Sequence, residues 1–282
     1  MTAGGRPPVV TRLPEIGITA ISRWVFNCYV IHDGGDGRPV VVDLGLPSHI
    51  DDVARALAAH GGAALDDLAA AVATHGHIDH VGGLPPLHRA HGTATYLPAA
   101  MAEMRDGTLP RRPPGLRAVA QILPVLASQP RDLGAVREAT SAGREIGWDH
   151  QGVRIPHEPA GWLRDGEALP GLPGWQVLAA PGHSDDSTCL YHPATRTLLS
   201  GDAVLSVEGR AWFTPELVDG RAAVATEHRL RGLDVEHLLP GHGRIVTGPR
   251  VMDEALSFAE RPAKASKLGA AWRIARNHAG HG

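Results

Sequence analysis

Cysteine is scarce in this 282-residue sequence, which contains only Cys28 and Cys189. The two residues lie far apart and lack the paired spacing of a cysteine–zinc site. Both lie in apolar segments typical of β-strands, so we expect buried, free thiols; a disulfide or a reactive thiol is the alternative. Free thiols fit a reducing compartment such as the cytoplasm.

Long hydrophobic runs and an excess of positive charge are also missing. No segment approaches the roughly 18 apolar residues that span a bilayer, and residues 1–15 contain no continuous apolar stretch like that of a signal peptide. The formal net charge of −3 predicts no general attraction to nucleic acid or to anionic membranes. We therefore expect a cytoplasmic globular protein with a sizeable core that acts on a small molecule.

Three common catalytic motifs are absent as well. Residues 182–186 read GHSDD, so the G-x-S-x-G sequence of serine hydrolases is incomplete. The sequence contains no G-x-x-x-x-G-K-[ST] phosphate-binding loop and no G-x-G-x-x-G sequence after the first strand. Serine-nucleophile and nucleotide-dependent mechanisms can therefore be set aside.

The sequence does contain a dense group of ligand-type side chains in the stretch ATHGHIDHVGG, residues 73–83. Imidazole and carboxylate groups bind divalent metals such as zinc. In an extended backbone His75 and His77 point to the same side and could share one ion. Asp79 and His80 follow the turn and face another direction. The spacing therefore suggests two neighbouring metals.

Histidine or aspartate also follows several other predicted strands. Apolar segments end in VVVD, AVATHGH, VLAAPGH, LLSGD and HLLPGH. In sheets covered by helices, ligands collect where the carboxyl ends of strands open into loops. We therefore expect Asp43, the histidine cluster, His183, Asp202 and His242 to meet at one edge of the fold.

Together these segments resemble the metallo-β-lactamase superfamily. HGHIDH matches its H-x-H-x-D-H signature, and PGHSDDS, LLSGDAV and LLPGHG follow in the family's order, so the pattern spans residues 27–243. The resemblance implies an α/β (α+β) fold, a four-layer αβ/βα sandwich forming a single domain over residues 1–282 with an internal pseudo-repeat. The later motifs look most similar to the glyoxalase II-like and β-lactamase-like-2 branches.

The resemblance also implies a role for each ligand. One metal would be held by His75, His77 and His183, the second by Asp79, His80 and His242, and Asp202 would bridge the two. Zinc is the expected metal, with iron and manganese as alternatives, and a metal-bridging hydroxide would attack the substrate. Asp79 is expected to orient this hydroxide and to protonate the leaving group, while Asp43 supports the histidine loop.

A dinuclear-metal hydrolase of an ester, thioester or lactone is the leading prediction. A β-lactam is less favoured, because class B lactamases often lack the pair present here as Asp79 and His80. Glutathione thioesters are disfavoured, since the basic C-terminal pattern for glutathione is not found. The alternatives are a phosphodiesterase or ribonuclease, a mononuclear-iron enzyme similar to persulfide dioxygenases, and a binding scaffold without catalysis.

The stretch between His80 and His183 is longer than a minimal version of the fold needs. Within residues 99–165 we expect a helical lid over the metal edge, with weakly helical patches at 116–128 and 133–143, because long insertions commonly form lids. An oligomer contact, such as a homodimer interface, or a linker is the alternative. Closing helices are predicted within residues 250–275, at 252–260 and 263–275.

Several other polar residues could support the site or simply face solvent. Asp185 and Asp186 either hold the loop after His183 or are exposed acids. Four arginines could meet an anionic substrate, although a solvated charged face is the favoured interpretation: Arg105, Arg111, Arg112 and Arg117. Three further histidines are expected at the surface or in the core: His88, His150 and His157.

Overall fold

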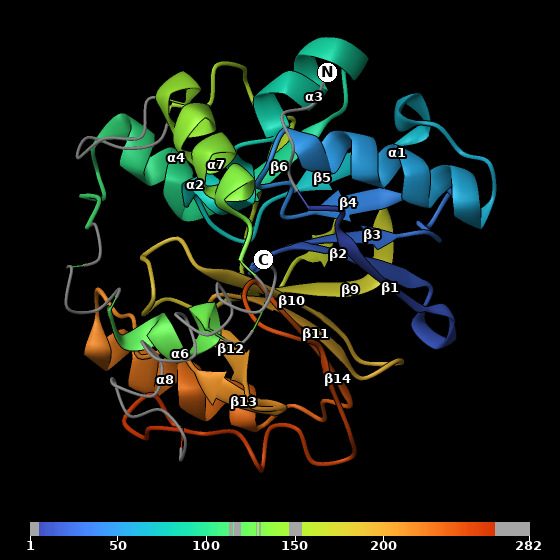
Figure 1. The fold of residues 1–282 in the computed structure, drawn as a ribbon. Coiled ribbons are helices and arrows are strands. Elements are labelled where there is room, and N and C mark those ends of the chain that lie inside the picture. The colour runs from blue at the N-terminus through green and yellow to red at the C-terminus, as the bar shows by residue number, and fades with distance from the viewer. Residues whose placement is uncertain are drawn as a thin grey trace, which may run out of the picture.

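Two β-sheets packed face to face form the centre of the protein (Figure 1). The computed structural model describes residues 6–112, 115, 120–127, 129, 131–146 and 154–262. The first sheet contains, in spatial order, β1 (Val9–Leu13), β2 (Ile18–Arg23), β3 (Phe26–Ile31), β4 (Val40–Val42), β5 (Ala70–Val72), β6 (Thr95–Pro98) and β7 (Gly161–Leu163). The second contains β15 (Val246–Thr247), β14 (His237–Pro240), β11 (Thr197–Gly201), β10 (Thr188–His192), β9 (Leu172–Ala179) and β8 (Ala168–Leu169).

The connections between strands determine which pairs are parallel. Short turns join β1 to β2 and β2 to β3, and these pairs are antiparallel, as is β3 with β4. The pairs β4–β5, β5–β6 and β6–β7 are parallel. Parallel neighbours need a long crossover connection between them, because the chain must return to the same end of the sheet. The helices α1 (Ser48–His60) and α3 (Leu84–His91) supply the first two crossovers. The pair β11–β14 is also parallel, with α8 (Gly220–Arg231) in its crossover.

One hydrophobic core lies between the two sheets. Alternate side chains of the first sheet, such as Ile18, Val40 and Val72, pack against Val177 and Leu199 from the second. The central strands β4 and β5 are buried on both faces, as expected for parallel strands covered by helices. Their sequences, VVV and AAV, are apolar throughout for this reason.

Helices cover the outer faces of both sheets, which gives four layers (Figure 1). Val53 and Leu57 of α1 pack with Leu84 and Leu87 of α3 in the cluster on the first sheet. Leu230 of α8 lies in the cluster on the outer face of the second. The predicted helix–sheet–sheet–helix sandwich is therefore observed. A separate hairpin, β12 (Val204–Val207) with β13 (Arg210–Phe213), extends beside the second sheet and was not predicted.

Helices and one strand form in the described part of residues 99–165, the segment predicted to form a lid. The segment contains α4 (Ala99–Asp106), α6 (Leu123–Leu126) and α7 (Leu133–Glu145), and its last part forms β7, a strand of the first sheet. The helix α7 packs against α2 (Ile78–Val81), the short helix that carries Asp79 and His80. Residues 113–114, 116–119, 128, 130 and 147–153 lie outside the described residues.

Small residues and one carboxylate explain why α7 lies there. A side chain at Gly143 would collide with Ile78, since an added Cβ would lie 2.0 Å from Ile78 Cδ1. The Glu138 carboxylate accepts hydrogen bonds from the backbone N–H and, at 2.7 Å, from the hydroxyl of Ser48 at the start of α1, where the helix dipole favours an anion. The helix α7 therefore packs against the chain that carries the second half of the predicted metal motif.

The helix predicted at 252–260 is wrong. These residues form turns, and Leu256 pairs with β13: its N–H donates to Ala211 O, and its carbonyl accepts from Phe213 N, both at 2.9 Å. The strand β13 offers the N–H and the carbonyl of Leu256 hydrogen-bond partners. This pairing with a distant segment overrides the local helical pattern. The second predicted helix, 263–275, lies outside the described residues. Within the described part of the chain, no helix has the length and apolar character needed to cross a membrane.

Candidate metal centre

The carboxyl ends of strands from both sheets deliver the predicted ligands to one edge. His75 and His77 follow β5, and Asp79 and His80 begin α2 directly after them. In the second sheet, His183 follows β9, Asp202 follows β11 and His242 follows β14. All seven predicted residues lie together, in two groups whose ligand atoms are within 4.8 Å of one another inside each group.

The first group consists of His75, His77, His183 and Asp202. His183 Nε2 lies 3.1 Å from His77 Nδ1 and 3.4 Å from Asp202 Oδ2. His75 Nε2 is 3.8 Å from the same carboxylate oxygen. Three imidazole nitrogens and one carboxylate oxygen around one point form a donor set suited to a borderline divalent ion.

The second group consists of Asp79, His80 and His242. His242 Nε2 lies 3.1 Å from Asp79 Oδ2, and His80 Nε2 lies 4.0 Å from that oxygen. Asp202 approaches this group as well, with 3.1 Å to His242 Nε2 and 3.5 Å to His80 Nε2. The Asp202 carboxylate therefore lies between the two groups, where the resemblance placed a bridging ligand.

The polar atoms at the centre fit a cation. His75 Nε2, His80 Nε2 and Asp202 Oδ1 are buried and have no hydrogen-bond partner in the described structure. Leaving buried polar atoms unpaired costs free energy, which a bound cation would offset. Gly241 has no side chain, and this lets the backbone lie close to them. A Cβ at this position would collide with Asp202 Oδ1 at 2.3 Å and with the His80 ring at 2.7 Å.

Burial and neighbouring charge shift the pKa values of the ligands. Burial, followed by the neighbouring imidazoles, lowers the pKa of His75 well below the usual histidine value. Burial and His183 lower the pKa of His77 to about 3. These two imidazoles are thus neutral at physiological pH, which is the form that binds a metal.

The second group behaves in the opposite way. Burial lowers the pKa of His80, but the carboxylates of Asp43 and Asp202 outweigh burial and raise that pKa well above the usual value. The same holds for His242, which faces Asp202 and Asp79. Although burial opposes it, the contacts with His242 and His80 hold the pKa of Asp79 and of Asp202 below the usual range. In this group the pKa shifts therefore stem from attraction between the imidazoles and the carboxylates that face them.

Backbone carbonyls orient two of the ligands. His183 Nδ1 donates to Glu216 O at 3.0 Å, and His242 Nδ1 donates to Val25 O at 2.8 Å. In each ring this leaves Nε2 facing the centre, an arrangement typical of metal-binding histidines. The His242 loop is held further by Asn27, whose amide donates to Pro240 O and Gly243 O at 2.8 Å.

Asp43 contacts both the loop that carries His75 and the second ligand group. Its Oδ1 accepts from Thr74 N at 2.8 Å, and its Oδ2 lies 3.0 Å from His80 Nδ1. The residue has φ 57°, a left-handed conformation that aspartate and asparagine tolerate better than most residues. These contacts agree with the supporting role expected for this strand-end carboxylate.

Asp186 provides a second support. Of its two predicted roles, holding the loop after His183 or facing solvent as an exposed acid, the structure agrees with the first. It is buried, and its Oδ2 accepts from Gly76 N at 2.6 Å. The bond connects the loop after His183 to the loop between His75 and His77. Its neighbour Asp185 instead accepts from Arg112, an arginine of the insertion.

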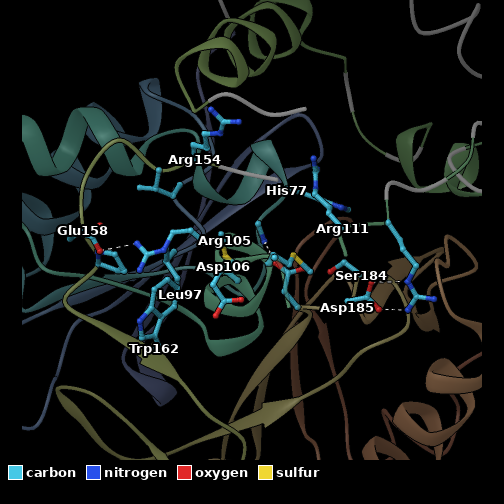
Figure 2. A pocket seen from close by; sticks show the side chains of 18 of the residues that line it. His77, Leu97, Arg105, Asp106, Arg111, Arg154, Glu158, Trp162, Ser184 and Asp185 are labelled. Carbon is cyan, nitrogen blue, oxygen red and sulfur yellow. Dashed lines mark hydrogen bonds and ion pairs between the residues drawn. The ribbon is translucent and has the colours of Figure 1, made fainter. Parts of the chain in front are cut away.

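A cavity of about 550 Å³ opens beside His77 (Figure 2). Its lining includes Gly76, Ser184 and both Asp185 and Asp186, and the wall beyond them comes from α4 and from residues 154–162. The volume falls within the range of about 300–1,000 Å³ that is usual for small-molecule sites. A small molecule in this cavity would have one end next to the histidine cluster.

Comparison with known proteins agrees with the motifs and the geometry. The family model for the metallo-beta-lactamase superfamily matches residues 23–242. The chain belongs to the metallo-β-lactamase superfamily. It is 24% identical to "Probable metallo-hydrolase YflN" of Bacillus subtilis (strain 168) over 266 residues, which cover 87% of this chain and 90% of that protein.

Solved structures of the superfamily share the fold. The structure titled "Crystal structure of TTHA1623 in a di-iron-bound form" is 28% identical, with a TM-score of 0.50, covering 81% of this chain and 92% of that one. A second, the family protein TTHA1429 from Thermus thermophilus, is 21% identical with a TM-score of 0.53, covering 95% and 79%. The four-layer fold predicted for this metallo-β-lactamase superfamily member is thereby confirmed.

Some supporting residues were not predicted from the sequence. The carbonyls of Val25 and Glu216 carry no sequence signal, because any residue has a carbonyl. Arg154 lines the cavity and was missed, while Arg117 and His150 lie outside the described residues. His88 and His157 stack on each other with ring centroids 4.0 Å apart, and neither belongs to the two ligand groups. Cys28 and Cys189 are buried, free thiols, as predicted.

Proposed function

We propose that this superfamily member is a dinuclear-metal hydrolase that cleaves an ester, thioester or lactone bond. The observation that carries the proposal is the convergence of seven histidine and aspartate side chains into two adjacent groups, with Asp202 between them. The relative from Bacillus subtilis is named as a probable metallo-hydrolase, which supports the reaction class.

Two divalent ions would be held by His75, His77 and His183 on one side and by Asp79, His80 and His242 on the other, with Asp202 within reach of both groups. Two such ions, when bound, supply a water whose pKa falls from about 16 to about 7 and polarise the scissile carbonyl. We propose zinc for both positions. Iron is the main alternative, since one relative is described in a di-iron-bound form and imidazole and carboxylate suit either metal.

The side chains of this protein account for the remaining steps. Asp79 is the acid–base residue in this proposal, because its carboxylate lies among the second-group ligands and is partly accessible, with 18% of the side chain exposed. Its low pKa keeps it ionised, so that it can accept a hydrogen bond from the attacking water and pass the proton to the leaving group. The substrate body lies in the adjoining cavity, which positions the scissile bond.

The proposal is tested by metal analysis together with a substrate panel. We expect two metal ions per chain and zinc-dependent cleavage of at least one acyl thioester, lactone or aryl ester. Asp79→Asn, which keeps the side-chain shape, should reduce kcat by about 10²–10⁴-fold, whereas the exposed Asp253→Asn should not change it. Failure of the metal-loaded protein to cleave any of the three substrate types would contradict the assignment.

Two alternatives have distinct signatures in the same experiments. A phosphodiesterase or ribonuclease would cleave aryl phosphodiesters in preference to esters and would bind RNA with steep salt dependence. A mononuclear-iron enzyme would contain one iron per chain.

A cytoplasmic location also stays part of the proposal, supported by the two free thiols.

A further inference from the structure

The turn between β2 and β3 has an unusual backbone conformation. Arg23 and Phe26 pair across the two strands, so Trp24 and Val25 form a two-residue turn. Trp24 has φ 55°, a left-handed conformation that favours glycine or asparagine in such turns. A bulky residue in this conformation costs free energy, and it persists only where the surrounding contacts hold it. The contacts of the Trp24 side chain therefore have to offset this cost.

The indole of Trp24 is held by a residue far away in the sequence. Its Nε1 donates at 3.0 Å to the carbonyl of Leu126, the last residue of α6. The ring also packs edge-on against Phe26, with ring centroids 5.9 Å apart. The hydrogen bond connects the first sheet to the segment 99–165. The helix α6 thus anchors the β2–β3 turn.

The same turn holds a predicted metal ligand. The carbonyl of Val25 accepts from His242 Nδ1 at 2.8 Å, which leaves Nε2 facing the second ligand group. The Phe26 ring lies edge-on to the His242 ring, with centroids 6.1 Å apart. Trp24 directly precedes both residues in the sequence. A shift of Trp24 would therefore move the two groups that contact this imidazole.

The helix α6 itself rests on the β12–β13 hairpin. It lies beside β12 (Figure 1), and its Val125 is fully buried in a cluster that includes Trp212 of the hairpin. The hairpin also holds the backbone of the ligand, because Ser206 N donates to His242 O at 3.2 Å. The hairpin therefore supports His242 twice, directly through the backbone and indirectly through α6 and Trp24.

We propose that Trp24 is a positioning residue for the second metal site. It ties the β2–β3 turn to α6, so that the Val25 carbonyl and the Phe26 ring keep His242 Nε2 facing the metal. The inference rests on the dinuclear site of the proposed function and gives α6 a part in that site. Glycine would suit the backbone of the turn better than tryptophan does. Turn preference and support of His242 therefore predict opposite results when glycine replaces Trp24.

Three variants separate these two effects. Trp24→Gly relieves the left-handed backbone but removes the indole, whereas Trp24→Phe keeps an aromatic ring and removes the N–H donor to Leu126. Glu208→Gly is the matched control, since Glu208 is exposed and has φ 53° in the turn of the β12–β13 hairpin. Both zinc dissociation constants are measured by competition with a chromophoric chelator. Absorption spectra of the cobalt(II)-loaded proteins report the ligand geometry, and the melting temperature of each metal-free variant shows that it is folded.

Loss of a direct partner of a metal ligand costs about 10–100-fold in affinity, and Trp24 lies one contact further away. We therefore expect one of the two dissociation constants to rise by about tenfold in Trp24→Gly and by about threefold in Trp24→Phe. The other constant should stay near its original value, and the cobalt bands of the affected site should shift. In Glu208→Gly both constants and the spectrum should equal those of the unmodified protein.

The positioning role is refuted if both constants are unchanged in Trp24→Gly, or if Glu208→Gly weakens the same site equally. If Trp24→Gly does not fold, the same criteria apply to Trp24→Phe. None of these measurements needs a substrate, so a protein that binds two ions but hydrolyses nothing contradicts the hydrolase assignment without touching the role of Trp24.

Nuclear magnetic resonance of the metal-free protein decides the role if fewer than two ions bind. The ring N–H that His242 donates to Val25 should exchange with water about tenfold faster in Trp24→Gly than in the unmodified protein or in Glu208→Gly. Equal exchange rates in all three proteins would overturn the inference.

Discussion

Asp43 offers a sharp test of how the surroundings of the metal centre control its ligands. One carboxylate oxygen accepts from Thr74 N at 2.8 Å, and the other lies 3.0 Å from His80 Nδ1. In Asp43→Asn the amide oxygen can keep the bond to Thr74, and asparagine tolerates the left-handed backbone that Asp43 adopts. The loop should therefore stay in place while the charge is removed.

The amide nitrogen of that variant would then face His80. Because it donates a proton to Nδ1, it favours the imidazole form that carries its proton on Nε2, the atom that faces Asp79 and Asp202. That form cannot bind a metal through Nε2. Changes to such supporting contacts cost about 10–100-fold in metal affinity, or about 1.4–2.8 kcal/mol at 1.4 kcal/mol per tenfold.

The assay is a competition titration of zinc against a chromophoric chelator, with kcat/KM measured in parallel. We expect one of the two dissociation constants to rise by about 10–100-fold and the other to stay near its original value. Asp36→Asn, in an exposed turn where the carboxylate accepts from Arg38 N, is the control and should bind both ions normally. Two unchanged dissociation constants in Asp43→Asn would refute the argument that Asp43 sets the proton position on His80.

Three further predictions concern stability. His49 is buried with both ring nitrogens unpartnered in the described structure, and burial lowers its pKa to about 3; as pH falls below about 6.5 the unfolded chain takes up a proton that the folded one does not. Between pH 7.5 and pH 5 the metal-free protein should therefore lose about 2 kcal/mol of unfolding free energy through this residue, a loss that urea titrations should not find in His49→Leu; equal losses in both proteins would rule His49 out. Asp186→Ala leaves Gly76 N–H buried without its partner and should lower the unfolding free energy by about 1.5–3 kcal/mol, whereas a change below about 0.5 kcal/mol would show that the bond to Gly76 is unimportant. Removing metals with a chelator should lower the melting temperature, and zinc at about 100 times its dissociation constant should restore about 2.7 kcal/mol for each occupied site; a melting temperature insensitive to both treatments would argue against bound metals.

The candidate ligands were predictable because their chemistry is written in short, local spacings. HGHIDH places three imidazoles and a carboxylate on one turn, and each later ligand follows an apolar strand that ends at the same edge. Helix α1 carries a similar local signal, since its buried side chains Val53 and Leu57 are four residues apart, as the helical period requires. A pattern that repeats within a few residues needs no knowledge of distant contacts.

Errors appeared where distant segments compete for the same backbone. Residues 252–260 have a helical pattern, yet Leu256 pairs with β13. The end of the expected lid is a sheet strand, β7, because β6 presents a free edge that Gly161–Leu163 complete. In both cases hydrogen bonds to a segment far away in sequence outweigh local preference.

The sequence alone determined which side chains can bind metals and in what order they reach the edge. Only the tertiary structure decided how those side chains are oriented, because the carbonyls of Val25 and Glu216 that orient His242 and His183 come from other parts of the chain. It also decided the cavity, where α4 and residues 154–162 bring arginines and apolar side chains beside His77. Spacing along the chain sets local geometry, whereas packing of the two sheets sets which distant backbone groups and charges meet there.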